Sequence, residues 1–560
     1  MKLSLLLSLA ALAILPLEAC AKQEKVLNLV PYPQEVVINS GSFKVAGAAF
    51  NCDPSVDARS QEAIRKFTVR LSQTSGKIST FTTPVGLAAS ADAGKIKGFV
   101  FTKDNSLASG EYSIEVGSKA VRVKTSDFYG TLYAIETLKQ LMPVAVYGSK
   151  ADESANWHIP CVSIKDAPRF GYRGMHMDCS RHFWSVDEVK KYIDVMAMYK
   201  LNRLHWHLTD DQGWRIELKN YPELALIGGF RDGTMIGKDF DSNDGKRYGG
   251  YYTQEQIKDI IKYADERGIT IIPEVDLPGH MLAALAAYPQ LGCTGGPYKV
   301  WHRWGISDEV LCPGKPATFE FLKGVLSEIA DLFPGEYFHI GGDECPKVEW
   351  EKCPDCQKLI AELGLKDDDN ASAEQYLQNY VMTFCQKVLE EKGKKVIGWD
   401  EILEGDLEEG AIVMSWRGTA GGIKAARMGY DVIMTPNSYY YLDYYQSKDT
   451  ENEPLAIGGY LPVEKCYSFD PYESIAPELQ HHILGVQANL WTEYIPSNEQ
   501  LEYMLLPRML ALCEVQWCKP ENCNYERFKT AVVDHQFKIL DLLGYNYCRA
   551  IVEHPDQPEK

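Results

Sequence analysis

Two carboxylates stand side by side in the stretch HIGGDECP at residues 339–346. Asp343 and Glu344 follow an apolar run and two glycines, a position typical of the end of a buried strand. Adjacent carboxylates raise the proton affinity of one another, so one can stay protonated near neutral pH while its neighbour stays ionised. A solvated loop pair is the alternative, but the position after a strand favours acid–base catalysis.

Acids and tryptophans occur in the same way elsewhere, at or just past the end of an apolar run. They are Asp178, Asp210 with Asp211, Asp276, Asp400 with Glu401, Trp416, and Trp491 with Glu493. A sugar suits such a set, because the C–H faces of a pyranose stack on aromatic rings and its hydroxyls bond to Asp, Glu and Arg. Glycosidic cleavage needs an acid for the leaving oxygen and a negative group to support charge at the anomeric carbon.

The adjacency of the two carboxylates restricts the mechanism. Successive residues of a strand point to opposite sides, so Asp343 and Glu344 cannot flank one bond as nucleophile and acid. One of them is therefore expected to act on a different part of the substrate. A substrate that supplies its own nucleophile would explain this arrangement.

The elements that must position these residues begin after Pro168, where apolar strands alternate with helical patterns, as in parallel βαβ units. Strands are expected at 171–179, 202–210, 268–276, 337–344, 394–401, 411–417, 430–436 and 483–491. This α/β pattern fits a (β/α)8 TIM barrel, in which the carboxyl ends of all strands converge on one face. A doubly wound sheet is the alternative, but no glycine-rich phosphate loop follows the first strand.

Helices are expected between the strands, including 187–199, with Ser185 and Glu188 as a capping box, and 318–333. Upstream, short β-like pieces such as 111–116 and 119–125 precede an amphipathic stretch at 129–143. We therefore expect a smaller α+β accessory domain at 26–166, followed by a catalytic barrel with a C-terminal helix at 167–550.

The chain has 560 residues, enough for two domains, and a formal net charge of -19. That charge argues against a nucleic-acid partner. Residues 1–20 are typical of a secretory signal, so the protein is expected to be exported, to the periplasm or the cell surface. Residues 17–20 also resemble a bacterial lipoprotein cleavage box, although Glu18 is unusual there; lipid anchoring at Cys20 and simple release both stay open.

Export permits disulfides. Cys293 and Cys312 flank a Gly- and Trp-rich segment that is expected to be a loop stapled at its base. Cys353 and Cys356 form a CxxC pair, but zinc needs four ligands and only Cys345 lies near them in sequence, which favours local disulfides or buried thiols. No metal ligand and no cofactor is expected.

His205 and His207 share one face of a strand, so one alternative is that they bind a metal ion. Buried histidines that hydrogen-bond to their neighbours are the favoured interpretation.

Several further motifs extend the pattern: YRGMHMD at 172–178, HWHLTDDQGWRIE at 205–217, PEVDLPGH at 273–280, GWDE at 398–401, SWR at 415–417, YYLD at 440–443 and NLWTE at 489–493. With HIGGDE, this ordered set resembles glycoside hydrolase family 20, the β-N-acetylhexosaminidases. The resemblance covers about residues 169–517, and the upstream α+β region fits the family's accessory domain.

The resemblance implies an exo-acting enzyme that removes terminal non-reducing N-acetylglucosamine or N-acetylgalactosamine from glycans by substrate-assisted retaining catalysis. By it, Glu344 is the acid and then the base, while Asp343 orients the 2-acetamido group whose carbonyl attacks the anomeric carbon. Tyr441 would bond that carbonyl. The remaining implied roles are walls for the acetamido pocket (Trp399, Trp416, Trp491), ligands for the ring hydroxyls (Arg173, Asp443, Glu493) and supports for the acidic pair (Asp210, Asp276, His280).

Two other functions compete with this interpretation. A noncatalytic carbohydrate-binding barrel would keep the aromatic walls, but it has no need of Glu344. A metal-dependent barrel hydrolase would need His and Asp ligands on separate strands and would be sensitive to EDTA.

Overall fold

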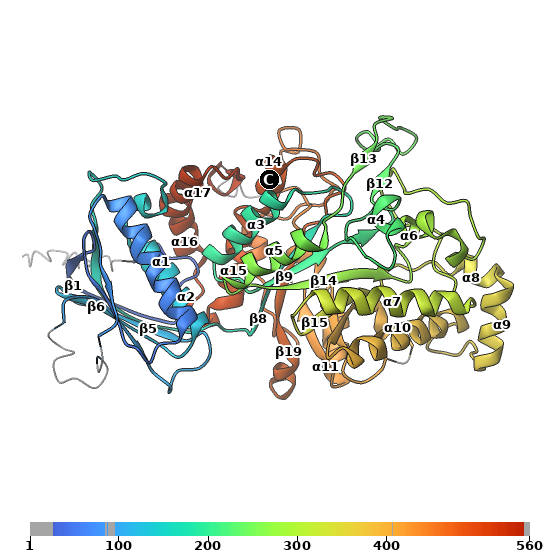
Figure 1. Ribbon diagram of the computed structural model, residues 1–560, viewed down its shortest axis with the longest axis horizontal. Helices are drawn as coiled ribbons and strands as arrows, with labels where there is room; N and C mark the ends of the chain where they lie inside the picture. The colour runs from blue at the N-terminus through green and yellow to red at the C-terminus, as the bar shows by residue number, and fades with distance from the viewer. Residues whose placement is uncertain (1–25, 85–86, 88–95, 406, 554–560) are drawn as a thin grey trace, which may run out of the picture.

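The computed structural model describes residues 26–84, 87, 96–405 and 407–553. Within them the chain forms two domains that lie side by side (Figure 1). The expected secretory signal and Cys20 lie outside the described residues. No helix in the described ranges is both long and apolar enough to cross a membrane.

The accessory domain is a mixed seven-stranded sheet with the order β1-β7-β5-β6-β4-β2-β3. Its strands are β1 Glu35–Lys44, β2 Phe50–Cys52, β3 Phe81–Thr82, β4 Gly98–Lys103, β5 Tyr112–Val116, β6 Ala120–Thr125 and β7 His158–Asp166. Two helices, α1 Ala58–Ser75 and α2 Phe128–Leu141, lie together over one face of this sheet (Figure 1). The two expected strands are β5 and β6, and the expected amphipathic helix is α2, so these predictions are confirmed.

The second domain is a closed barrel of parallel strands with the order β14-β15-β16-β17-β18-β19-β8-β9. The strands are β8 Tyr172–Asp178, β9 Arg203–His207, β14 Thr270–Leu277, β15 Tyr337–Gly341, β16 Lys395–Trp399, β17 Ile412–Ser415, β18 Asp431–Met434 and β19 Ile483–Ala488. All eight expected strands are present, and closure between β19 and β8 rules out the open doubly wound sheet.

The connections of the barrel carry the remaining elements. Short strands are β10 Thr209–Asp210, β11 Gly213–Trp214, β12 Phe230–Arg231 and β13 Tyr248–Gly249. Helices are α3 Val186–Met198, α4 Glu223–Leu226, α5 Gln254–Asp265, α6 Leu282–Ala287, α7 Pro316–Leu332, α8 Val348–Lys352, α9 Pro354–Leu363, α10 Ala373–Glu391, α11 Ala420–Arg427, α12 Asn437–Tyr440, α13 Val463–Tyr467, α14 Asn498–Leu505, α15 Arg508–Trp517, α16 Tyr525–Ala531, α17 Phe537–Leu543 and α18 Ala550–Glu553.

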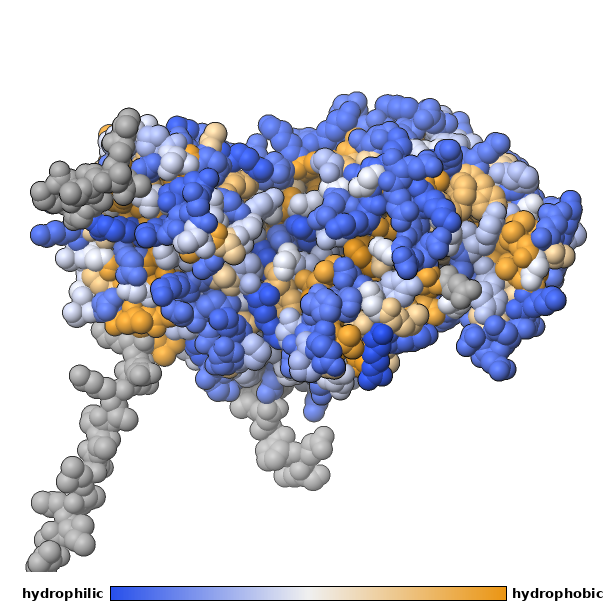
Figure 2. All heavy atoms as spheres, turned by 90° about the horizontal axis from the view of Figure 1, so that it is seen from below, coloured by the Kyte–Doolittle hydropathy of each residue, from blue (hydrophilic) through white to orange (hydrophobic). Residues whose placement is uncertain are grey.

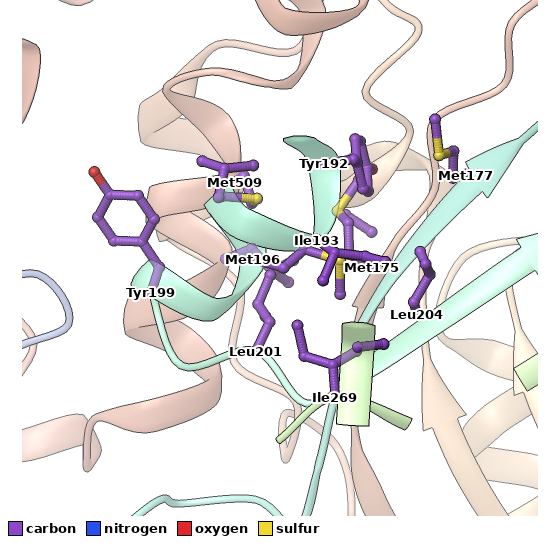
Figure 3. Packing of buried hydrophobic residues seen from close by; sticks show 14 of the residues in the cluster. Met175, Met177, Tyr192, Ile193, Met196, Tyr199, Leu201, Leu204, Ile269 and Met509 are labelled. Carbon is purple, nitrogen blue, oxygen red and sulfur yellow. The ribbon is translucent and has the colours of Figure 1, made fainter. Parts of the chain in front are cut away.

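Helix α3 illustrates how the sequence builds this outer layer. It begins at the expected capping box, in which Ser185 and Glu188 bond to each other's backbone N–H groups. Figure 3 shows Ile193 and Met196 of the helix packed near Met175 of β8. Each such buried side chain contributes about 1.5–3 kcal/mol of hydrophobic stabilisation, which holds β8 in place beneath the helix.

The junction between the domains is a buried polar cluster. Lys200 Nζ lies 3.2 Å from Asp166 Oδ2 and 2.8 Å from the hydroxyl of Tyr112, while Trp517 Nε1 donates to Asp166 Oδ1 at 2.9 Å. Lys200 precedes β9, so the accessory domain packs at the amino ends of the neighbouring barrel strands. A site at their carboxyl ends must therefore be built from barrel loops.

The surface is largely hydrophilic (Figure 2). Figure 2 shows a face on which hydrophilic residues predominate and apolar residues form small, separated patches. A hydrophilic surface of this kind, together with the net charge of -19, favours solubility.

Candidate active site

The two adjacent carboxylates follow β15 on a sharp turn. Gly341 and Gly342 have φ values of 63° and 96°, and Glu344 has a φ of 46°. A Cβ on Gly341 would lie 1.7 Å from Asp276 Oδ1, so only glycine fits there. The turn separates the environments of the two acids: Asp343 is buried, whereas the side chain of Glu344 is 38% exposed.

His280 lies between this pair and a buried acid. Its Nε2 is 3.8 Å from Asp343 Oδ2 and 3.7 Å from Glu344 Oε2, and its Nδ1 is 3.1 Å from Asp210 Oδ1. Burial alone would lower the pKa of His280, but the charges of Asp210 and Asp276 raise it well above its ordinary value. A cationic imidazole therefore faces both carboxylates.

The titration of Asp343 is displaced upward. Burial raises the pKa of Asp343 to about 6, the charge of His280 opposes that rise, and the charge of Glu344 adds to it. Burial and the charge of Asp343 raise the pKa of Asp276 well above its ordinary range, and a hydrogen bond joins these two side chains. Above about pH 6, Asp343 is a buried and oriented anion.

Three tryptophans and a tyrosine form a box beside Asp343. The rings of Trp416 and Tyr441 stack with centroids 5.9 Å apart at 12°, and Trp491 lies 6.4 Å from Tyr441 and 5.9 Å from Trp399. Burial, then the charges of Asp443 and Asp343, raise the pKa of Tyr441, which keeps its hydroxyl protonated as a donor. The box thus combines apolar walls with one hydroxyl and one carboxylate.

The indole N–H groups of two of these tryptophans fix the walls. Trp399 Nε1 donates to Glu274 at 3.0 Å, and Trp416 Nε1 donates to Glu401 at 2.9 Å. Burial and the charge of Asp343 raise the pKa of Glu401 to about 8. Glu401 is therefore largely neutral at pH 7 and adds little negative charge near Asp343.

A charged cluster closes the other end of the site. Arg181 Nη2 lies 2.7 Å from Asp210 Oδ2, its Nη1 lies 4.0 Å from Glu493 Oε1, and its guanidinium lies 5.0 Å from the centre of the Trp491 ring. Asp443 is buried, and its Oδ1 has no hydrogen-bond partner in the described part of the chain. Because buried acceptors are normally satisfied, this oxygen suits a ligand hydroxyl.

The prediction that Arg173 contacts ring hydroxyls is wrong. Arg173 is near the amino end of β8, where it donates to the carbonyls of Phe170 and Lys200, each at 2.8 Å, and to the hydroxyl of Tyr133. It belongs to the domain junction. The arginine just past the carboxyl end of the same strand is Arg181, which the sequence reasoning missed, although it lies three residues after Asp178.

The two histidines of β9 are bonded to buried acids, the arrangement that the favoured interpretation expects. His207 Nδ1 and Nε2 lie 2.5 Å from Glu274 and 3.0 Å from Asp210, and His205 Nε2 lies 3.0 Å from Glu274. Asp210 is buried and bonded to His207, His280 and Arg181, so it orients other site residues and has little room to bind a substrate itself.

The expected staple between Cys293 and Cys312 is absent, since both are free cysteines. The objection to zinc, that too few cysteines lie close together, is also wrong. The fold brings Cys293 and Cys312 to Cys353 and Cys356, so that four sulfur atoms meet.

A groove of about 890 Å³ lies elsewhere, between α1 and α2 of the accessory domain and α3 and α5 of the barrel. None of the predicted site residues lines it. The convergence of acids and indoles, and not the volume of a cavity, identifies the candidate site.

Comparisons with known proteins agree with this geometry. The sequence matches "Glycosyl hydrolase family 20, catalytic domain" over residues 170–520 and "Glycosyl hydrolase family 20, domain 2" over residues 26–167. A "Beta-hexosaminidase" of Porphyromonas gingivalis is 42% identical over 555 residues, which cover 97% of this chain and 68% of that protein. A "Beta-hexosaminidase" of Akkermansia muciniphila is 33% identical and matches 79% of this chain and 86% of its own length.

Solved structures lead to the same result. A GH20 exo beta-N-acetylglucosaminidase from Vibrio harveyi, in complex with N-acetylglucosamine, superposes with a TM-score of 0.78 at 32% identity, over 93% of this chain and 78% of that one. A GH20 beta-N-acetylhexosaminidase from Streptomyces coelicolor gives a TM-score of 0.79 at 29% identity, over 93% of this chain and 97% of that one. The chain therefore belongs to glycosyl hydrolase family 20 and is a glycoside hydrolase.

Proposed function

We propose that this protein is an exo-acting β-N-acetylhexosaminidase that releases terminal N-acetylhexosamine from glycans, with retention and with the substrate's own acetamido group as nucleophile. One observation carries the proposal: His280 faces both members of the acidic pair, yet Asp343 is buried beside the tryptophan box and Glu344 is exposed. The two acids thus serve different parts of one substrate.

In the first step the acetamido group occupies the box of Trp399, Trp416 and Trp491. Asp343 accepts a hydrogen bond from its N–H, and the hydroxyl of Tyr441 donates to its carbonyl oxygen. That oxygen bonds to the anomeric carbon as the glycosidic bond breaks, and Glu344 gives its proton to the leaving oxygen. The product is an oxazolinium ion whose positive charge is balanced by Asp343.

In the second step Glu344, now a carboxylate, takes a proton from a water molecule. The water oxygen bonds to the anomeric carbon, and the bond from that carbon to the acyl oxygen breaks, which restores the acetamide and the original anomeric configuration. Glu344 regains its proton and is ready for the next cycle.

The exo specificity follows from the charged end of the site. Arg181, Asp443 and Glu493 are suited to the hydroxyls of a terminal ring. Parallel assays with glucosaminide and galactosaminide substrates measure which configuration of the 4-hydroxyl this end of the site prefers. The two sugars differ at that position.

The test compares 4-nitrophenyl N-acetyl-β-D-glucosaminide with 4-nitrophenyl β-D-glucoside, which lacks the acetamido group. Rapid release from the first substrate and negligible release from the second are expected. Equal rates, or a glucosaminidase activity that a brief EDTA treatment abolishes, would overturn the proposal in favour of another hydrolase mechanism.

We also propose that the protein is exported. The support is the composition of residues 1–20, with Cys20 as the residue that would carry a lipid. Cell fractionation with and without Cys20→Ser distinguishes the two fates. An anchored protein moves from the membrane to the soluble fraction on substitution, a released protein is unaffected, and retention in the cytoplasm would contradict export.

A further inference from the structure

Four cysteine sulfurs meet next to α8 and α9. These two helices lie at the end of the barrel domain that is remote from the accessory domain (Figure 1). Two of the sulfurs belong to the connection that follows β14, and two belong to the segment that follows β15. Their ligand atoms all lie within 4.8 Å of one another, and the residues are Cys293, Cys312, Cys353 and Cys356.

The distances between these sulfurs fit a metal site. Cys312 Sγ lies 3.5 Å from Cys356 Sγ and 3.6 Å from Cys353 Sγ, and Cys293 Sγ lies 3.8 Å from Cys356 Sγ. A tetrahedral zinc ion with Zn–S bonds of about 2.3 Å holds its sulfurs about 3.8 Å apart. Cys312 and Cys356 each approach two other sulfurs at such distances, whereas a disulfide joins each sulfur to one partner only.

The backbone around the sulfurs favours negative charge. Cys353 is the N-cap of α9 and Cys356 lies in its first turn, where unpaired N–H groups stabilise a thiolate. Gly314 supplies a backbone hydrogen bond to Cys356, and the charge of Lys315 acts on Cys312. A Cβ on Gly314 would lie 2.2 Å from the carbonyl carbon of Asp355, so the two segments meet where only glycine fits.

The surroundings are those of a closed, structural site. Three of the four cysteines are buried and Cys293 is partly buried. They lie in a small apolar cluster, separate from the main core, with Val310, Trp350, Ile360 and Leu377. The indole of Trp350 also ties the two segments together by donating to the carbonyl of Leu311 at 2.8 Å.

We propose that Cys293, Cys312, Cys353 and Cys356 bind one structural Zn²⁺ ion. The four thiols release their protons to solvent on binding, and the resulting doubly negative complex is offset by the N–H groups and by Lys315. Four protein sulfurs leave no open position for water, so the ion holds loops together and takes no part in the hydrolysis. It anchors the segment that begins with Cys345, directly after Glu344, against the connection from β14.

The decisive measurement is the metal content of full-length wild-type protein purified from the exported fraction. Elemental analysis should give about one zinc per chain. Zinc release should make four additional thiols titratable, and Co²⁺ exchanged into the site should give the visible absorption of a tetrahedral thiolate complex. These measurements need no variant to fold.

Variants locate the ion. The double substitution Cys353→Ser and Cys356→Ser should abolish zinc binding and lower the melting temperature. Cys345→Ser is the matched control, because Cys345 is buried in the same cluster but is not one of the four sulfurs. It should retain the metal.

Three results would overturn the proposal. The first is a wild-type protein that contains no metal and in which peptide mapping finds a disulfide at any of the four cysteines. That result would show a covalent cross-link in place of a zinc site. Iron at one ion per chain would refute the choice of metal. Equal zinc content in the double variant and the wild type would show that the ion binds elsewhere in the protein.

Discussion

Replacing His280 should displace the acid limb of the pH–rate profile. Asp343 must be ionised to accept the acetamido N–H, and burial raises its pKa to about 6. Activity is therefore present above that pH and is lost as the pH falls through it. The profile of kcat/KM reports titration in the free enzyme, so its acid limb should lie near pH 6 in the wild type.

The size of the displacement follows from one distance. His280 Nε2 lies 3.8 Å from Asp343 Oδ2. At that distance a unit charge stabilises a carboxylate by about 1 kcal/mol at the dielectric of water and about 4 kcal/mol at an effective dielectric of about 20. Since 1.36 kcal/mol corresponds to about one pH unit, His280→Gln should raise the pKa of Asp343 by roughly 0.8 to 3 units. The acid limb moves upward by that amount.

The assay records kcat/KM for the chromogenic glucosaminide from about pH 4 to pH 9 in wild type, His280→Gln and Asp343→Asn, with a melting curve for each variant. Asp343→Asn should have a low rate and no acid limb near pH 6. An acid limb that stays in place in folded His280→Gln, or that persists in Asp343→Asn, would refute the assignment of this titration to Asp343.

Three further substitutions test the remaining roles. Glu344→Gln should lower the rate by about 100- to 10,000-fold on a substrate with a poor leaving group, and much less on one whose leaving group is an activated phenol. An equal loss on both substrates would contradict the role of Glu344 as the acid. Tyr441→Phe should lower kcat by about 100-fold with correct folding, and an unchanged kcat would exclude its bond to the acyl oxygen. Arg181→Lys should lower kcat/KM by about 10- to 100-fold, since a hydrogen bond to a charged group contributes about 1.5–3 kcal/mol. Arg173→Lys, the control, should lower only the melting temperature. The reverse pattern would restore the role first given to Arg173.

The barrel and most of the site were predictable from the sequence, because strand ends are marked by local pattern. Each parallel strand is a short apolar run, and the acids and tryptophans that follow the runs meet because barrel geometry brings those ends together. Asp343, Glu344 and Trp416 are examples. The residue choices of the capping box before α3 are equally local.

The errors arose where direction or distance along the chain mattered. Arg173 lies near the amino end of β8 and Arg181 lies just past its carboxyl end, and only the strand's direction decides which of them reaches the site. Cys293 and Cys356 are 63 positions apart in sequence, so no local spacing indicated that they meet. The raised pKa of Asp276 depends on burial and on the nearby charge of Asp343 from the end of another strand, neither of which a linear pattern contains.

Weakening the substrate's acyl oxygen as a nucleophile tests whether that oxygen attacks the anomeric carbon. The wild-type kcat is measured for aryl glucosaminides whose N-acyl group is acetyl, fluoroacetyl, difluoroacetyl or trifluoroacetyl. We expect a steep, regular fall in kcat with each fluorine, because each makes the carbonyl a weaker nucleophile. A kcat that is independent of fluorination would contradict this expectation and would assign the attack to an enzyme side chain or to water.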